Sequence, residues 1–320
     1  LEESIAVFHA HDAKHDEALA LSYLKRSYSY SFRPSSEVEA AARRCALLFH
    51  EVGDRRREGR ALLDLGFYSK EPAEREGYFR ESVRLLRGAE DYYELTLALE
   101  NLAFHLTDTH GRYDEACEQL EEAIRIERAR GLDFRLARWL NHQGMMLAYA
   151  GRLEEAGAKH LEALEIGRGL AAGFGEWEYD HALWGLGQVS YLRGAFGEAK
   201  TYLERALALG ERHPNTPGNL GTEVRQSLVS LALAEGRLED AAELAQATWQ
   251  TFTAHRHDTY EDVWLEVVFH HQFGEIALAR SAWPEAEAQF ERGSSLAEDW
   301  RLLPLALHLG LGFAALAQQR

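Results

Sequence analysis

Gly194-Ala-Phe-Gly-Glu-Ala199 is one of five matching hexapeptides that decide the fold of this chain. The other four are Gly111-Arg-Tyr-Asp-Glu-Ala116, Gly151-Arg-Leu-Glu-Glu-Ala156, Gly236-Arg-Leu-Glu-Asp-Ala241 and Ser281-Ala-Trp-Pro-Glu-Ala286. Their last residues, here called the anchor alanines, follow one another at intervals of 40, 43, 42 and 45 residues. Glycine readily ends a helix in the left-handed conformation, and acidic residues favour the positive N-terminus of a following helix. Five copies in register therefore predict a repeated pair of helices joined by a short turn.

Apolar residues on both sides of these turns recur with the period of an amphipathic helix. The six prolines stand where such runs begin or end, which is where a helix tolerates proline. No segment shows the sustained alternation of a strand, so no sheet is expected. The expected helices are 14–31, 35–52, 55–69, 72–89, 92–109, 112–130, 133–150, 152–170, 176–193, 195–212, 219–235, 237–254, 259–280, 282–297 and 301–319, with residues 1–12 resembling the end of another.

Glycine also recurs inside the first helix of the pair, twelve residues before the anchor, at Gly144, Gly187 and Gly274. A glycine in a helix interior costs about 1 kcal/mol relative to alanine. Its repetition at one position predicts that two helices approach closely there.

The combination of Leu186-Gly187 in a first helix with Ala199 in the second resembles the tetratricopeptide repeat family. Partial versions are Gln143-Gly144 with Ala156 and Phe273-Gly274 with Ala286. The large apolar residue four positions after the anchor is present in three copies, but His160 and Ala245 replace it in the others. The resemblance implies an all-α fold, a right-handed α-solenoid of antiparallel helix pairs.

The resemblance is clear over 92–300 and weaker over 1–91, where Leu65-Gly66 is the best fragment. The repeats here are 40–45 residues long, whereas the repeat of the family has 34 residues. Longer repeats of this kind are similar to those in two groups of bacterial proteins. These are the sensor arms of maltose-activator-like signal-transduction ATPases and the repeat domains of peptide-pheromone receptors. We expect a single solenoid over 1–320 that ends in an apolar helix over 301–319. Because a solenoid needs polar caps, such an end favours a piece of a longer chain with effector domains, or else a helix that caps by burying both faces.

Composition limits the classes of partner. The chain has 35 basic and 52 acidic residues, a net charge of −17, which argues against direct binding of nucleic acid. No apolar run approaches the roughly 20 residues of a membrane-spanning helix, and no secretory signal is present. Two cysteines cannot form a disulfide framework and suit a reducing compartment. The expectation is a soluble, cytoplasmic protein.

Motifs of catalysis or cofactor binding are weak. The segment Gly194–Thr201 resembles a phosphate-binding loop but lacks its adjacent Gly-Lys pair and follows a helix rather than a strand. His9, His11 and His15 cluster near the N-terminus without the glutamate of a metalloprotease motif. We therefore expect no enzyme activity, no cofactor and no metal.

Candidate binding residues follow from the resemblance, which implies that first helices line a concave groove. Counting fifteen residues back from each anchor gives Asn101, Asn141, Trp184, Gln226 and His271. Counting eleven back gives His105, Met145, Gln188, Ser230 and Glu275. Neighbouring positions add Arg138, His181 and Tyr191. The first two columns lie one helical turn apart and form adjacent stripes on one face.

Two interpretations of these columns stay open. Asparagine is a mediocre helix former, and its amide can pair with both backbone groups of an extended peptide. Trp184 and Tyr191, seven residues apart, would provide an aromatic wall for a bound side chain. Alternatively, the asparagines bond to a neighbouring helix or to water. The leading hypothesis is a sensor module that binds a peptide, protein or small effector; the alternative is an assembly scaffold without a small ligand.

Overall fold

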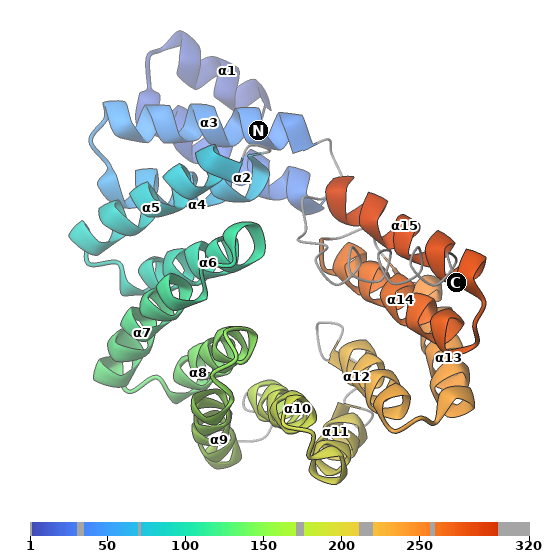
Figure 1. Ribbon diagram of the computed structural model, residues 1–320. Coiled ribbons are helices and arrows are strands. Elements are labelled where there is room, and N and C mark those ends of the chain that lie inside the picture. Colours follow the sequence, from blue (N-terminus) through green and yellow to red (C-terminus); the bar gives the residue numbers. More distant parts are fainter. Residues whose placement is uncertain are drawn as a thin grey trace. The chain divides into compact units, whose positions relative to one another are not determined.

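The computed structural model describes residues 2–30, 35–69, 72–170, 176–210, 220–256 and 260–299. Within these ranges the expected helices are confirmed, with ends displaced by at most two residues, and no strand is present (Figure 1). The predicted helix over 301–319 lies outside the described residues. The helices are α1 (Glu2–Ala10), α2 (Lys14–Tyr30), α3 (Ser35–Glu51), α4 (Arg55–Tyr68), α5 (Pro72–Gly88), α6 (Tyr92–His110), α7 (Tyr113–Arg130), α8 (Asp133–Tyr149), α9 (Leu153–Gly169), α10 (Glu176–Leu192), α11 (Phe196–Gly210), α12 (Leu220–Ala234), α13 (Leu238–His255), α14 (Tyr260–Ala279) and α15 (Trp283–Asp299).

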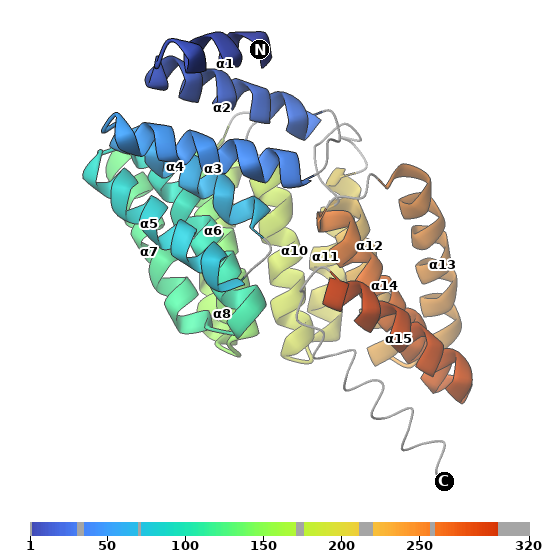
Figure 2. The same ribbon diagram turned by 90° about the horizontal axis from the view of Figure 1, so that it is seen from above.

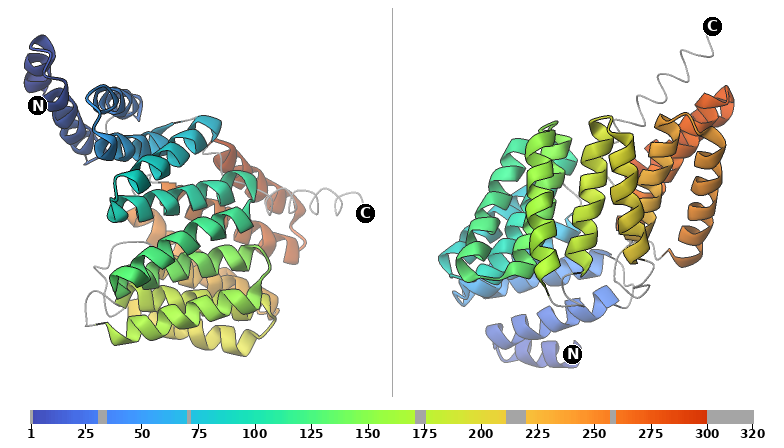
Figure 3. Two further views of the ribbon diagram at one scale, coloured as in Figure 1. Left: turned by 90° about the vertical axis from the view of Figure 1, so that its left-hand side faces the viewer. Right: turned by 90° about the horizontal axis from the view of Figure 1, so that it is seen from below.

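The chain divides into two compact units, Leu1–Gly131 and Leu132–Arg320, here called the N-unit and the C-unit. In the N-unit, α2 packs on α3, α4 on α5 and α6 on α7 (Figure 2). In the C-unit, α8 to α11 stand side by side as antiparallel rods, and α14 packs on α15 (Figure 3, right). Within the C-unit, α8, α10 and α12 lie on the inner side of a curve and α9, α11 and α13 on its outer side (Figure 1).

The turns form as the hexapeptides predict. Their first glycines have positive φ angles, from +60° at Gly111 to +76° at Gly151, and Ser281 takes +58° in the fifth copy. At Gly151 the chain closes back on the preceding helix, because the amide of Arg152 donates to the carbonyl of Leu147 at 2.9 Å. This pattern ends the first helix, satisfies its last carbonyls and lets the second helix start within two residues.

The close helix approach predicted at the repeated glycines is confirmed. A Cβ atom at Gly144 would lie 2.6 Å from His160 Nε2, and one at Gly274 would lie 2.5 Å from a ring carbon of Phe290. Each partner stands four residues after its anchor. In the fourth repeat the sizes are exchanged, with Val229 in place of the glycine and Ala245 in place of the large residue, both fully buried. Each helix pair of the C-unit thus fills one crossing point with one large and one small side chain.

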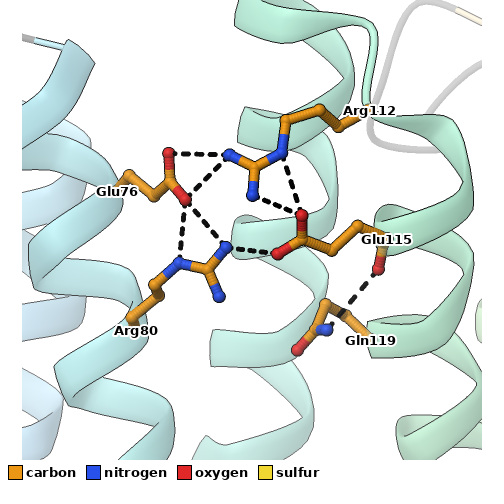
Figure 4. Close-up of polar contacts among 5 residues, drawn as sticks. All are labelled: Glu76, Arg80, Arg112, Glu115 and Gln119. Atoms are coloured by element: carbon orange, nitrogen blue, oxygen red, sulfur yellow. Dashed lines mark hydrogen bonds and ion pairs between the residues drawn. The ribbon is translucent and has the colours of Figure 1, made fainter.

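Ion pairs connect successive repeats in the N-unit. Glu76 of α5 accepts from Arg80 at 2.8 Å and from Arg112, just before α7, at 2.9 Å; both arginines also bind Glu115 of α7 (Figure 4). Hydrogen bonds from Arg80 hold the pKa of Glu115 below its usual range. Burial alone would raise the pKa of Glu76, but hydrogen bonds from Arg80 and Arg112 outweigh it and lower the value. The four charges compensate one another across two outer helices.

We expect Gly144→Ala to destabilise the C-unit although alanine is the better helix former. The His160 ring also lies tightly against α10, since a Cβ at Gly185 would lie 2.5 Å from His160 Nδ1, and this leaves the ring little room to move. Overpacking costs about 1–3 kcal/mol, against a gain in helix propensity of about 1 kcal/mol. Urea denaturation should show a lower free energy of unfolding for the Gly144→Ala variant. The matched control is Gly77→Ala on α5, where no atom lies within 4 Å of the new Cβ and stability should rise; equal effects of both variants would contradict the crossing model.

Candidate ligand-binding face

One side of α10 carries a continuous stripe of half-exposed side chains. These are Trp177, His181, Trp184, Gln188 and Tyr191, spaced three or four residues apart so that they share one face. On α8, half-exposed residues follow the same spacing at Arg138, His142 and Met145. Ser230 on α12 and His271 and Glu275 on α14 are also half-exposed. We call these residues together the first-helix face of the C-unit.

The column fifteen residues before the anchor has a packing role in the C-unit. The Asn141 amide donates to the carbonyl of Glu178 on α10 at 2.9 Å, and the Trp184 indole donates to Ser227 Oγ on α12 at 2.9 Å. Gln226 in turn donates to the carbonyl of Leu265 on α14 at 3.0 Å. Each side chain thus links its first helix to the next one. We call these three links the polar seam, and they match the helix–helix interpretation that the sequence left open.

Two sequence-predicted residues belong to the N-unit. The Asn101 amide donates to the carbonyl of Leu97 in its own helix at 2.7 Å. His105 is buried, and its ring lies edge-on to Phe79 at 5.9 Å between centroids. The eleven other predicted residues lie on four first helices of the C-unit, α8, α10, α12 and α14.

Several of these eleven are also engaged in packing. Gln188 donates to Ser227 Oγ at 2.7 Å, and Ser230 Oγ accepts from Gln272 at 3.0 Å. His271 lies 3.6 Å from Glu275 across one helical turn, and its ring is 5.9 Å from that of Phe290. The guanidinium of Arg138 lies 5.2 Å from the centre of the Trp139 ring. These contacts set the rotamers that the first-helix face presents.

A buried histidine supports the α8 end of the face. His160 of α9 donates from Nδ1 to Asn141 Oδ1 at 3.2 Å, so one amide joins α8, α9 and α10. Burial lowers the pKa of His160 to about 3, with a smaller contribution from His181 and His142. His160 is therefore neutral at physiological pH. The sequence marked it only as a departure from the apolar pattern; its partner on another helix was not readable.

The two ends of the face differ in charge. At the α8 end, burial lowers the pKa of His181 to about 4, and nearby His142 and Arg138 lower it as well, although a bond to the Trp177 carbonyl opposes this. At the α14 end, burial raises the pKa of Tyr191, and the negative charge of Glu275 raises it further. The face thus carries the positive side chain of Arg138 on α8, the aromatic rings of α10 and the negative side chain of Glu275 on α14.

Trp177 and His142 are members of the face that the column count missed. The Trp177 ring lies 4.3 Å from the His181 ring, centroid to centroid. Trp177 precedes His181 by four residues, or one turn, so extending the count by one turn beyond His181 would have found it. Among the described residues, no group of three or more His, Cys, Asp or Glu could hold a metal ion. Across the same ranges, no helix is long and apolar enough to cross a membrane.

Comparison with known proteins identifies the fold. No protein-family model matches the sequence, and neither does any curated protein. A tetratricopeptide repeat protein from Parabacteroides merdae is similar in structure, with a TM-score of 0.61, 14% identity and coverage of 93% of this chain and 98% of that one. A Rap protein complexed with competence and sporulation factor has a TM-score of 0.55 at 15% identity, covering 100% and 98%. NprR in complex with its cognate peptide NprX has 0.60 at 15%, covering 88% and 76%. The chain therefore has the tetratricopeptide-repeat-like, all-α fold that its sequence predicts.

Replacing the two asparagines separately should give different results. Asn141→Ala removes the amide that joins three helices and leaves buried polar groups without it, which costs about 1–3 kcal/mol. Asn101→Ala removes only a bond within its own helix, and alanine is the better helix former, so stability should stay within about 0.5 kcal/mol. Urea denaturation of the two variants measures the difference. An Asn141→Ala variant with an unchanged free energy of unfolding would show that this link of the polar seam is dispensable.

The stability of the C-unit should fall with pH below about 6.5. His160 and His181 have folded-state pKa values of about 3 and about 4, below the ordinary value of 6.5. Between these folded-state pKa values and pH 6.5, the unfolded chain binds more protons than the folded chain. The contribution of the neutral histidines to the free energy of unfolding is therefore complete above about pH 6.5 and is lost as the pH falls. Each group contributes a slope of up to about 1.4 kcal/mol per pH unit. In thermal melts between pH 7 and pH 5, the melting temperature should fall less steeply with decreasing pH in His160→Leu than in the unsubstituted protein. An equal dependence on pH would rule out this role for His160.

Proposed function

We propose that the chain is a recognition module whose C-unit binds a peptide or a protein segment on the first-helix face. The observation that carries this is the stripe of half-exposed aromatic and polar side chains along α10, continued on α8, α12 and α14. Exposed aromatic residues with polar neighbours are typical of binding hot spots, because they bury much area at low entropic cost. The polar seam holds these helices in register and so organises the face before a ligand arrives.

The charge distribution supports an extended ligand with a direction. Arg138 would bind an acidic side chain or a C-terminal carboxylate, and Glu275 would bind a basic side chain or an N-terminal amine. Trp177, Trp184 and Tyr191 provide rings between these ends. The solved NprR complex holds its cognate peptide on a similar fold, and the solved Rap complex holds competence and sporulation factor. Both are similarities of fold, at 15% identity, and they support a binding role for the same architecture here.

We further propose that the module is the sensor part of a bacterial cytoplasmic regulator, where occupancy of the face is passed to effector domains. No step of this proposal needs a catalytic group, a metal or a cofactor. The scaffold alternative differs in one respect, because a docking partner would use surfaces other than the first-helix face. The two hypotheses therefore predict different effects on binding when residues of the first-helix face are substituted.

Peptides selected from a random phage-displayed library on immobilised protein should lose binding when the face changes. Tyr191→Ala and Arg138→Gln replace half-exposed side chains outside the polar seam, so the fold should be retained. Loss of an anchor ring or a charged contact is expected to weaken binding by about 1–3 kcal/mol, or about fivefold to 150-fold, in a fluorescence anisotropy titration.

The matched control is Arg168→Gln on α9, whose exposed ion pair with Glu165 lies on a second helix. Peptides that bind all variants equally would place recognition elsewhere and favour the scaffold. Failure to select any peptide against the folded protein would count against peptide recognition altogether.

A further inference from the structure

A second concave site lies in the C-unit between α13, α14 and α15, which stand side by side in Figure 2. Its volume is about 280 Å³. One wall is a single face of α13, formed by Ala242, Gln246 and Trp249 at spacings of four and three residues. The other wall is a single face of α15, formed by Glu285, Gln289 and Arg292 at the same spacings. We call this site the outer trough.

The outer trough is separate from the first-helix face. Its floor is the side of α14 that carries Phe273 and Ala277. At 100° per residue, Ala277 points about 120° away from His271, and Phe273 about 160° away. The trough and the first-helix face therefore use opposite sides of the same helix, and the trough does not depend on the proposed function.

The inner part of the trough is apolar and rigid. The Trp249 ring lies edge-on to Phe273 at 6.1 Å and to Phe269 at 5.2 Å, centroid to centroid. Phe269 is fully buried, so the indole is supported from behind. Ala242 lies two turns before Trp249 on the same wall, and its small side chain leaves space that a larger one would fill. An apolar ligand group entering here would bury its surface against a preformed aromatic wall.

The rim of the trough is polar and carries hydrogen-bond donors. His270 Nδ1 donates to Gln289 Oε1 at 2.8 Å, which orients the Gln289 amide and leaves its two N–H donors for a ligand. Arg292 forms no ion pair with any described residue. Arg280 bonds to Glu239 at 2.7 Å, in a pair where both side chains are exposed.

The charge of the lining also stands out from the rest of the chain. Arg280, Arg292, Glu285 and Glu239, the partner of Arg280, balance one another at the rim, in a chain whose net charge is −17. The guanidinium of Arg292 and the two amide donors of Gln289 favour an anion over a cationic ligand.

The length of the walls limits the ligand. Residues 242 to 249 span seven steps of helix, or about 10 Å, which matches one ring with a short chain. From these dimensions, the aromatic wall and the donors of Gln289 and Arg292, we propose that the outer trough binds a small organic carboxylate with an aromatic or compact apolar body. The body lies against Trp249 and Phe273, and the carboxylate accepts hydrogen bonds from Gln289 and Arg292.

The probe for this proposal is 3-phenylpropionate, with uncharged 3-phenylpropionamide as its isostere. The expected dissociation constant of such a small ligand is on the order of 1 mM. Binding is followed by the indole N–H resonance of Trp249, identified among the seven tryptophans with Trp249→Phe. The resonance should shift saturably as the carboxylate is added. The affinity for the amide should be at least about threefold weaker, as expected for the loss of one exposed charge contact.

Two pairs of variants test the location and the charge. Ala242→Leu fills the trough and should abolish the shift, whereas Ala247→Leu, on the exposed side of the same helix, should leave it unchanged. Arg292→Gln should weaken binding about twofold to fivefold and Glu285→Gln should strengthen it to a similar extent. Both charged positions are exposed, so neither change should alter the fold.

Three results would overturn the proposal. These are no saturable shift at ten times the expected dissociation constant, equal affinity for acid and amide, or full binding by a folded Ala242→Leu variant.

Discussion

The contact between a small residue in one helix and a large residue in the next organises every repeat of the C-unit. Gly144 meets His160, Gly187 meets Leu203, and Gly274 meets Phe290 at the point where two helices cross. A protein interior is close-packed, so the summed volume of two facing positions matters more than either residue alone. The exchange of sizes at Val229 and Ala245 keeps that volume and shows why the repeat tolerates both arrangements.

Close crossing leaves the first helices near enough to one another for side chains to bridge them. Asn141, Trp184 and Gln226 each reach the following first helix with an N–H donor. Because these positions are buried or half-buried, a lost donor leaves a buried acceptor without its partner, and the links are directional in a way that apolar contacts are not. The polar seam therefore sets the register of α8, α10, α12 and α14, and with it the spacing of the rings and charges on the first-helix face.

Both units join neighbouring helices with exposed ion pairs, such as Arg280 with Glu239 in the C-unit, but the C-unit adds the polar seam. In the N-unit, arginines reach carboxylates 34 to 36 residues away, as between Arg80 and Glu115 and between Arg112 and Glu76. In the C-unit, the polar seam bridges 37 to 43 residues with neutral donors. Exposed ion pairs contribute little each and are screened by salt. Buried neutral hydrogen bonds keep their strength at high salt, which suits the unit that carries both the first-helix face and the outer trough.

The helices, their turns and the crossing points could all be predicted from the sequence. Those features depend on neighbours along the chain, such as the positive φ of Gly151, or on a fixed distance from an anchor, such as Gly144 and His160. The sequence also located the helices that carry the first-helix face, because helical periodicity groups residues on one side.

The partner of each polar side chain on those helices depends on how the helices pack in three dimensions. Asn101 and Asn141 occupy equivalent positions in the repeat, yet one amide bonds to its own helix and the other joins three helices. The outer trough is likewise absent from any sequence pattern, since its walls come from α13 and α15. A hydrogen bond or a cavity depends on the angle and distance between helices that are remote in the chain, and these are set by packing rather than by local spacing.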